Sequence, residues 1–349
     1  MIGPFCVFRC DAGPRIGIGH VARCRALADE LRPRGWRCAF AVSAETVATM
    51  PSLKTSGYPI VVLPPDFPAA GEPAHLSAAQ PEGCVLLIVD HYGRGVQFER
   101  ACRSWAKHIL VIDDLADRKH DCDWLLDPTL GREPDDYRPL VPGGATLLLG
   151  PDYALLRPAF AQVRPEALAR RRADPGLRRV LVSFGGTDPH DATGACLDAL
   201  VRLRPSFALD VVLGAAAPHL EAVRKRIGQM PNTALHVETA QMYELMSRAD
   251  CALGGAGATS WERCCVGLPT IVSILADNQR SIAKALAEAG AIRLVGDWRT
   301  AAAGQMVESL ASLTIDDLAG LSTRAAVICD GSGIFRTANA LEPLRQGYV

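Results

Sequence analysis

The chain has 349 residues, and its 37 Lys and Arg against 38 Asp and Glu leave a formal net charge of −1. Such a balance supplies no basic field for nucleic acid or for an anionic membrane surface, and no apolar run is long enough to span a bilayer. Because single hydrophobic cores rarely grow past about 250–300 residues, the length favours two domains. The N-terminal stretch lacks the pattern of a secretion signal, so we expect a cytoplasmic protein without membrane insertion.

The cysteines and histidines give no sign of a metal site. Twelve cysteines are scattered through apolar runs and helical patterns without a C-x-x-C pair, and the adjacent Cys264 and Cys265 cannot easily bind one metal ion together. The eight histidines form no H-x-x-x-H or H-E-x-x-H group. We therefore predict reduced, buried cysteines acting as small apolar side chains, with neither a metal nor another cofactor.

The first predicted unit of structure is a strand, a glycine loop and a helix. Residues 5–8 form an apolar run typical of a buried strand, and residues 21–31 have the pattern of an amphipathic helix. The N–H groups at such a helix start suit an anionic ligand, which glycines allow to approach closely. His20 follows the loop directly and is either a solvent-facing helix residue or a catalytic one. The loop contains Gly13, Gly17 and Gly19.

Two other glycine motifs can be compared with this loop. With Ala22 three residues after Gly19, the dinucleotide fingerprint is formally met, and Glu45 stands near the place of its acidic residue. This reading therefore stays open. The P-loop is excluded, because its G-K-[ST] sequence is absent.

Strand and helix patterns alternate through the first half of the chain. Apolar runs at 38–42, 60–63, 84–89 and 108–112 predict strands, 96–106 predicts a helix, and 124–126 and 146–149 could be two more strands. This alternation predicts a parallel sheet covered by helices, whose ligands bind beyond the carboxyl ends of the strands. The polar residues at those ends are Asp11, Asp90, His91, Tyr92, Asp113 and Asp114.

A second alternating series follows a basic, proline-containing segment. Residues 161–177 are interpreted as a helix and linker, with Arg170–Arg172 on a solvated face. Strands are predicted at 180–184, 209–213, 234–237, 251–253 and 270–274, with helices between and after them. The predicted fold is α/β, with two doubly wound Rossmann-like domains that face each other across a cleft. Residues 1–160 form the first domain, 178–330 form a nucleotide-binding second domain, and the C-terminal helix in 331–349 could pack back on the first.

The second half contains two glycine loops and a polar helix start. In GGAGATSWE, Thr259 or Ser260 could cap a helix whose first turn carries Glu262. Glu262 either complements the helix dipole or accepts hydrogen bonds from a ribose diol while loop N–H groups hold a diphosphate. Asp277, Asn278 and Gln279 open the next helix, where either the two amides bind substrate or Asp277 merely serves as an N-cap. The candidate substrate-binding residues here are Gly186, Thr187, Gly257, Ser260, Glu262, Asn278 and Gln279.

With these residues in view, the chain resembles a known family, the UDP-2,4-diacetamido-2,4,6-trideoxy-β-L-altropyranose hydrolases of pseudaminic acid biosynthesis. That family is similar in fold to the two-domain GT-B glycosyltransferases and is related to proteins of spore-coat polysaccharide synthesis. The matching motifs run in the family's order over nearly the whole chain. They are RCDAGPRIGIGHVAR, IVDHYG at 88–93, DD at 113–114, CDWLLDPT at 122–129, GPDYALLRPAF at 150–160, SFGGTD at 183–188, GAGATSWERCCVGLPTI and DNQ at 277–279.

The resemblance implies a GT-B-like fold and a role for several residues. His20 matches the general base, while Gly17 and Gly19 match the loop near the leaving diphosphate. Asp11 and Tyr92 match residues on the sugar side, grouped here with His20 as catalytic. The remaining matches, all to substrate-binding positions, are Arg157, Glu262 and Asn278.

These roles predict an enzyme that hydrolyses the anomeric C–O bond of a UDP-sugar without a metal and with inversion, releasing UDP and free sugar. A neutral imidazole suits the deprotonation of water near pH 7, and loop N–H groups can stabilise the departing diphosphate. A GT-B glycosyltransferase with an unknown acceptor and a non-catalytic nucleotide-sugar binding protein remain alternatives. As partners we expect only the small-molecule UDP-sugar, with no nucleic acid, and a monomer or weak homo-oligomer.

Overall fold

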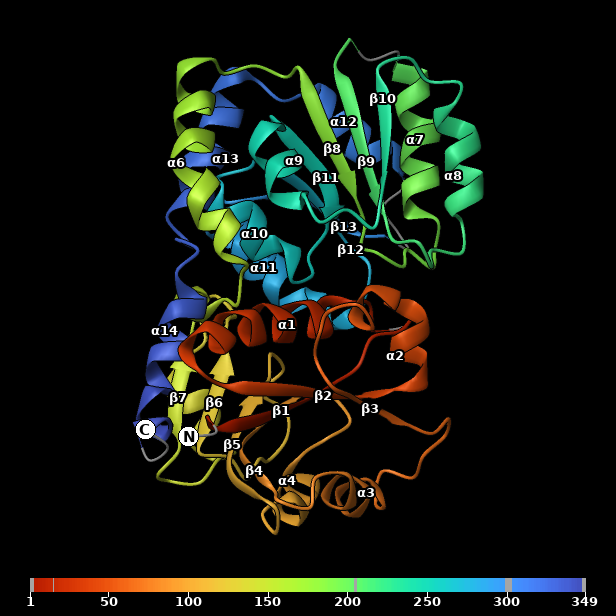
Figure 1. Cartoon of the computed structure of the whole chain (residues 1–349). Helices are drawn as coiled ribbons and strands as arrows, with labels where there is room; N and C mark the ends of the chain where they lie inside the picture. The colour runs from red at the N-terminus through yellow and green to blue at the C-terminus, as the bar shows by residue number, and fades with distance from the viewer. Residues whose placement is uncertain (1–2, 15, 204–205, 299–302, 347–349) are drawn as a thin grey trace. The chain divides into compact units, whose positions relative to one another are not determined.

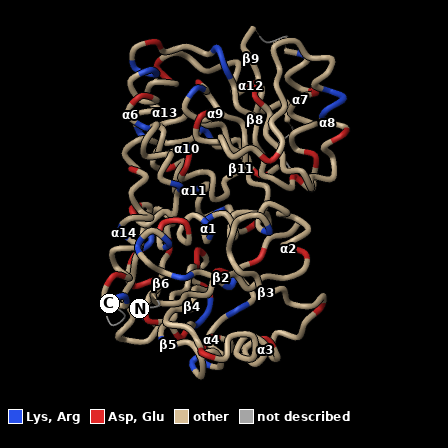
Figure 2. The backbone as a smooth tube through the Cα atoms, in the orientation of Figure 1, with Lys and Arg blue, Asp and Glu red and all other residues tan. Residues whose placement is uncertain are grey.

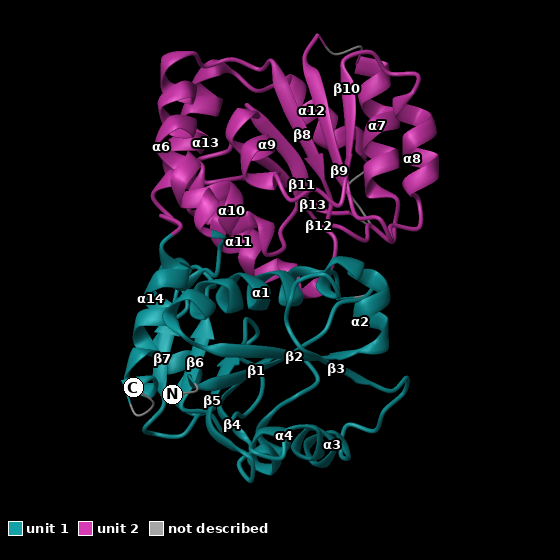
Figure 3. Cartoon of the chain, viewed as in Figure 1, with its two compact units in different colours: residues 1–157, 332–349 teal, residues 158–331 magenta. Residues whose placement is uncertain are grey.

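The computed structural model describes residues 3–14, 16–203, 206–298 and 303–346. The chain divides into two compact units, unit 1 with residues 1–157 and 332–349, and unit 2 with residues 158–331 (Figure 3). Each unit is built on one parallel sheet flanked by helices (Figure 1). The predicted fold class of two Rossmann-like domains is therefore confirmed.

The seven strands of unit 1 lie in the order β3-β2-β1-β4-β5-β6-β7. The direction of winding reverses between β1 and β4, which are hydrogen-bonded neighbours, with Cys10 opposite Asp90 in register. The segments that follow these two strands therefore leave the sheet side by side. The strands are β1 (Phe5–Cys10), β2 (Arg37–Ser43), β3 (Ile60–Leu63), β4 (Cys84–Asp90), β5 (Ala106–Ile112), β6 (Trp124–Asp127) and β7 (Thr146–Leu149).

Alternating side chains of these strands fill two apolar layers. Phe8 and Ile88 point into the layer beneath α1, whereas Val7 and Leu87 point into the opposite layer. Both faces of the sheet are covered, as expected of parallel strands that read as continuous apolar runs. The helices of unit 1 are α1 (Gly19–Leu31), α2 (Ala44–Thr49), α3 (Glu72–Ala79), α4 (Val96–Cys102), α5 (Pro134–Tyr137) and α14 (Gly333–Ala340).

The C-terminal helix α14 belongs to unit 1, although the chain reaches it only after completing unit 2. Ile334 and Ala338 enter the same apolar layer as Leu27 of α1, and Arg34 Nη1 donates to Asn339 Oδ1 at 2.6 Å. Contacts of α14 with α1 and with the turn at 151–153 attach it to this unit.

Unit 2 has six strands in the order β10-β9-β8-β11-β12-β13, with winding reversed between β8 and β11. The strand β13 was not predicted. The strands are β8 (Arg179–Ser183), β9 (Ala208–Leu213), β10 (Thr233–Val237), β11 (Cys251–Gly255), β12 (Thr270–Ile274) and β13 (Arg293–Asp297). The helices are α6 (Pro158–Ala173), α7 (Ala192–Leu203), α8 (Leu220–Ile227), α9 (Met242–Arg248), α10 (Thr259–Cys265), α11 (Arg280–Glu288), α12 (Ala303–Ala311) and α13 (Ile315–Ala326).

The segment interpreted as a linker, 161–177, lies mostly inside α6, and α6 belongs to unit 2. The prediction of a solvated arginine face is wrong for Arg171, which is only 7% exposed. Its guanidinium donates to the carbonyls of Met246 at 2.6 Å and Ala249 at 2.8 Å. These carbonyls lie at the C-terminal end of α9, where the helix offers them no further backbone N–H group. The hydrogen bonds from Arg171 satisfy them and hold α6 against α9.

Charges are spread over both units, with Lys and Arg interspersed among Asp and Glu along the backbone (Figure 2). Within the described ranges, none of the helices has the length and apolar character that crossing a bilayer requires.

Candidate active site

The first glycine loop leaves β1 and closes on itself before α1 begins. Gly13 and Gly17 form a two-residue bridge, with Gly13 N donating to Gly17 O at 3.1 Å and Gly17 N donating to Gly13 O at 2.8 Å. Gly17 has a φ of 75°, a conformation that glycine adopts without steric cost. A Cβ on Gly13 would lie 2.7 Å from Glu45 Oε2. The loop is thus held in shape where it delivers Gly19 to the start of α1.

His20 lies in the first turn of α1 and is 6% exposed. Its Nδ1 is 2.5 Å from Oδ1 of Asp90, the last residue of β4. Asp90 also receives two hydrogen bonds from Arg23, from Nε at 2.6 Å and from Nη2 at 2.7 Å. A histidine, a carboxylate and a guanidinium therefore form one buried group at the carboxyl edge of the sheet.

The charge of Asp90 decides the tautomer of His20. Burial by itself would raise the pKa of Asp90, but Arg23 and His20 outweigh it and hold that pKa far below its ordinary value. An ionised carboxylate only accepts hydrogen bonds, so we assign the neutral imidazole's proton to Nδ1. This tautomer leaves Nε2 of His20 as a proton acceptor.

Two further side chains border this group. The ring of Tyr92, two residues after β4, meets the His20 ring edge-on at a centroid distance of 4.7 Å. Arg23 Nη1 lies 3.2 Å from Asp114 Oδ2 beyond the end of β5. The sequence analysis placed Asp90 among the strand-end residues but gave it no role. It did not identify Arg23 as a site residue, although its position one helical turn after His20 would have indicated that the two side chains lie on the same face of the helix.

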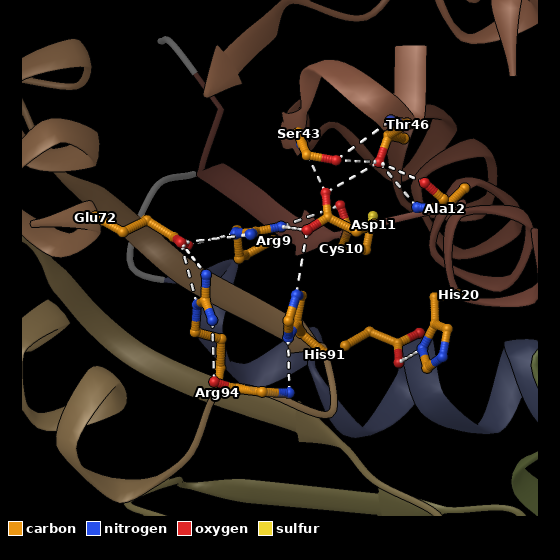
Figure 4. Close-up of polar contacts among 12 residues, drawn as sticks. Arg9, Cys10, Asp11, Ala12, His20, Ser43, Thr46, Glu72, His91 and Arg94 are labelled. Atoms are coloured by element: carbon orange, nitrogen blue, oxygen red, sulfur yellow. Dashed lines mark hydrogen bonds and ion pairs between the residues drawn. The ribbon is translucent and has the colours of Figure 1, made fainter. Parts of the chain in front are cut away.

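Asp11, the residue after β1, is surrounded by hydrogen-bond donors (Figure 4). Oδ1 accepts from the Ser43 backbone N–H at 2.6 Å and from Thr46 Oγ1 at 3.0 Å. Oδ2 lies 2.8 Å from Arg9 Nη1 and 3.2 Å from His91 Nε2. Burial would raise the pKa of Asp11, but His91, Arg9 and the Ser43 N–H outweigh it and depress that pKa strongly. Asp11 thus contributes negative charge and cannot donate a proton near pH 7.

The charges continue from Arg9 into the interior (Figure 4). Arg9 is 1% exposed, and its Nε donates to Glu72, which opens α3 and is fully buried. Arg94 Nη2 lies 2.5 Å from Glu72 Oε2. This Arg9 network, defined here as Asp11, Arg9, Glu72 and Arg94, anchors the start of α3, a helix that the sequence analysis did not predict.

Replacing Glu72 by Gln is expected to lower the free energy of unfolding at pH 7 by about 3 kcal/mol, because Arg9 then loses a buried counter-charge. Burial opposes ionisation of Glu72, but Arg9 and Arg94 outweigh it and lower its pKa from 4.5. The stability that comes from this depressed pKa is present above 4.5 and disappears as the pH falls through the lowered value. Urea denaturation of both proteins from pH 7 downward should therefore show the difference shrinking in acid.

Glu342→Gln is the matched control, since Glu342 pairs with Arg345 at 2.5 Å in unit 1 but both side chains are about one-third exposed. Exposed pairs contribute about 0–1 kcal/mol. Equal losses in the two variants, or a loss for Glu72→Gln that does not depend on pH, would contradict a stabilising Arg9 network.

In unit 2, two glycine loops leave the sheet where its winding reverses. β8 and β11 are neighbours, with Ser183 opposite Gly254. A Cβ on Gly254 would lie 2.4 Å from Ser183 O, so only glycine fits between these strand ends. After β8, Gly185 has a φ of 106°, and the carbonyl of Gly186 accepts from Gly214 N at 2.8 Å. Ligands of doubly wound sheets bind at this kind of crevice.

The helix after the second loop begins differently from the prediction. α10 starts at Thr259 with Ala258 as its N-cap, and no side chain caps it. The predicted cap by Thr259 or Ser260 is therefore wrong, because Thr259 is already helical and Ser260 Oγ accepts from Arg263 Nη2 at 3.0 Å. Glu262 lies in the first turn and is half-buried.

The DNQ segment forms a short 3-10 helix, Asp277–Gln279, beside this loop. Oε1 of Gln279 accepts from the backbone N–H groups of Ala256 and Leu275, both at 3.1 Å. Gln279 thus braces the second glycine loop with its carbonyl oxygen, and Asn278 precedes it in the same half-buried turn.

The candidate residues fall into groups that each unit assembles from separate parts of its chain. Arg157 is the last residue of the first segment of unit 1 and is half-buried. In the described part of the chain, no three His, Cys, Asp or Glu side chains are grouped as metal ligands. Unit 1 places Asp11, Gly17, Gly19, His20 and Tyr92 around the ends of β1 and β4. Unit 2 places its candidate residues in the loops after β8 and β11, in the first turn of α10 and in the 3-10 helix after β12; they are Gly186, Thr187, Gly257, Ser260, Glu262, Asn278 and Gln279.

These two units define the GT-B class of fold. The solved structure of MurG from Acinetobacter baumannii is similar to this chain with a TM-score of 0.67 at 14% identity, covering 97% of this chain and 100% of MurG. At that identity the likeness concerns the fold alone.

Two curated proteins are similar in sequence. The spore coat polysaccharide biosynthesis protein SpsG of Bacillus subtilis is 26% identical, covering 97% of this chain and 98% of SpsG. The UDP-2,4-diacetamido-2,4,6-trideoxy-beta-L-altropyranose hydrolase of Campylobacter jejuni is 25% identical, covering 81% of this chain and 96% of that protein. No family model matches the chain. The resemblance predicted from the motifs is confirmed by these two relatives.

Proposed function

We propose that the chain hydrolyses a UDP-sugar, with UDP-2,4-diacetamido-2,4,6-trideoxy-β-L-altropyranose as the substrate and pseudaminic acid biosynthesis as the process it serves. The observation that carries this proposal is the His20–Asp90 contact of 2.5 Å, with Asp90 in turn bound by Arg23. A pure binding protein needs no oriented base beside a glycine loop. The name of the Campylobacter relative supports the same activity.

In the proposed reaction, Nε2 of His20 takes a proton from a water molecule whose oxygen attacks the anomeric carbon. The bond between that carbon and the diphosphate oxygen breaks, and its electron pair leaves with UDP. Attack on the face opposite UDP inverts the anomeric centre. The departing diphosphate is already a good leaving group, so glycine-loop N–H groups and a helix N-terminus suffice to stabilise its charge. No step requires a metal ion.

The other candidate residues have roles in binding under this proposal. Tyr92 and the ionised Asp11 contact the sugar, and Glu262 accepts hydrogen bonds from the ribose hydroxyls. Arg157 and Asn278 bind further groups of the substrate. The backbone of the glycine loops contacts the diphosphate, through Gly17, Gly19, Gly186, Thr187, Gly257 and Ser260, with Gln279 keeping the last of these loops in shape.

The test is UDP release from this nucleotide sugar in the presence of EDTA and without any acceptor. We expect stoichiometric free sugar, and in oxygen-18 water we expect the label on the sugar's anomeric hydroxyl and not on UDP. Proton NMR of the first product should show the inverted anomer.

The second candidate function is a glycosyltransferase, which the fold similarity to MurG favours. Tight UDP binding with no release until an acceptor alcohol is added would contradict the hydrolase and support the transferase.

A further inference from the structure

Unit 2 contains a buried arginine that the proposed chemistry leaves unused. Arg263 lies near the end of α10 and is 3% exposed. Its Nη2 donates to the carbonyl of Gly255 at 2.5 Å and to Ser260 Oγ at 3.0 Å, while its Nε has no hydrogen-bond partner. Among the residues that the structure describes, no carboxylate forms an ion pair with it.

The guanidinium lies at the crevice where the winding of the unit 2 sheet reverses. A Cβ on Gly254 would be 2.9 Å from Arg263 Nη1 and 2.4 Å from Ser183 O, so Nη1 lies close to the adjoining ends of β8 and β11. The carbonyl of Gly255 that Nη2 contacts belongs to the start of the second glycine loop. Arg263 therefore places a positive charge directly beneath a loop suited to an anion.

A second buried arginine in the same unit shows what a structural role requires. Arg171 uses all three guanidinium nitrogens, with Nε donating to Ala249 O at 3.2 Å, Nη1 to Val266 O and Nη2 to Met246 O at 2.6 Å. These carbonyls precede β11 and β12, at the amino end of the sheet. Arg263, at the carboxyl end, keeps an Nε without a hydrogen-bond partner, and among the carboxylates of the described residues its charge is offset only by the neighbouring Glu262, with which it forms no ion pair.

Leaving a buried charge unpaired costs several kcal/mol, and a bound anion would remove that cost. Burial lowers the pKa of Arg263 to about 10, so the group stays charged near pH 7. An approaching diphosphate would add negative charge beside a guanidinium on which, among the described carboxylates, only Glu262 acts, without an ion pair. Its oxygens are also acceptors of the kind that a guanidinium prefers.

We infer that Arg263 is an anion-stabilising residue whose charge, held beneath the glycine loop 254–258, stabilises the bound diphosphate of UDP. This role rests on the proposed function and adds to it a residue that neither the loop motifs nor the helix start indicates.

The experiment is calorimetric titration of the full chain with UDP, uridine and inorganic pyrophosphate. Arg263→Gln removes the charge but can still donate to the Gly255 carbonyl, so we expect the affinity for UDP and for pyrophosphate to fall roughly 10-fold or more. Uridine affinity should stay the same, and Arg263→Lys should recover part of the UDP affinity. Arg171→Gln is the matched control, which should lower the melting temperature without changing UDP affinity.

Different outcomes separate this inference from the function on which it rests. If the native chain binds neither UDP nor pyrophosphate, both are overturned. If the native chain binds UDP and Arg263→Gln binds it equally well, only the role of Arg263 is overturned. Equal losses for uridine and UDP would show that Arg263 merely shapes the loop. Should Arg263→Gln fail to fold, Arg263→Lys decides. It keeps the charge but loses the fork of guanidinium donors, so UDP and pyrophosphate should bind more weakly than to the native chain while uridine binds equally well, and unchanged UDP affinity would overturn the role of Arg263.

Discussion

Alanine in place of His20 is expected to lower the rate of UDP release by about 10²-fold or more while leaving UDP affinity nearly unchanged. The reason is that Nε2 of His20 is the proton acceptor that its contact with Asp90 prepares. Pre-steady-state measurement of UDP release at saturating substrate would report the chemical step directly. Calorimetric titration with UDP would report binding separately.

His108→Ala provides the control for this substitution. His108 is in unit 1 near the amino end of β5, the opposite edge of the sheet from His20, and its ring packs on Trp124. Its removal should leave the rate of UDP release unchanged. A native rate in His20→Ala would overturn His20 as the base and direct attention to another acceptor.

Asparagine in place of Asp90 is expected to reduce the rate by about 10²–10⁴-fold, the range that general base catalysis contributes, because the histidine loses its orienting carboxylate. Arg23 donates to both carboxylate oxygens, so it should draw the amide oxygen toward itself. The amide NH₂ would then face Nδ1 of His20 and force the imidazole proton onto Nε2. The base would be present in the wrong tautomer, which nitrogen-15 NMR of the histidine can detect.

Asp114→Asn is the control for this second substitution, because Asp114 also pairs with Arg23, at 3.2 Å, but has no contact with His20. We expect a smaller rate loss and an unchanged tautomer. The double variant His20→Ala with Asp90→Asn should be no slower than His20→Ala alone, since the two residues act as one unit. Additive losses would contradict a positioning role for Asp90.

Much of the architecture follows from local sequence. Apolar runs between turn residues predicted twelve of the thirteen strands, and β3, β7 and β12 have the predicted bounds. The missed strand β13 has only half-buried residues and meets β12 across a register shift at Val272–Ser273, so it lacks the continuous apolar run of a central strand. The whole of α3 was missed, because its first residue, Glu72, is buried by ion pairs and not by a hydrophobic periodicity.

The sequence by itself determined the two α/β series, the three glycine loops and the place of His20 at a helix start, because each depends on residues a few positions apart. The partners of the charges were decided only by the tertiary structure. Asp90 reaches His20 across 70 positions because β4 lies beside β1, and Glu72 reaches Arg9 across 63. A sequence contains the charges, but strand order selects which of them meet, and it leaves the buried Arg263 with an Nε that has no hydrogen-bond partner among the described residues.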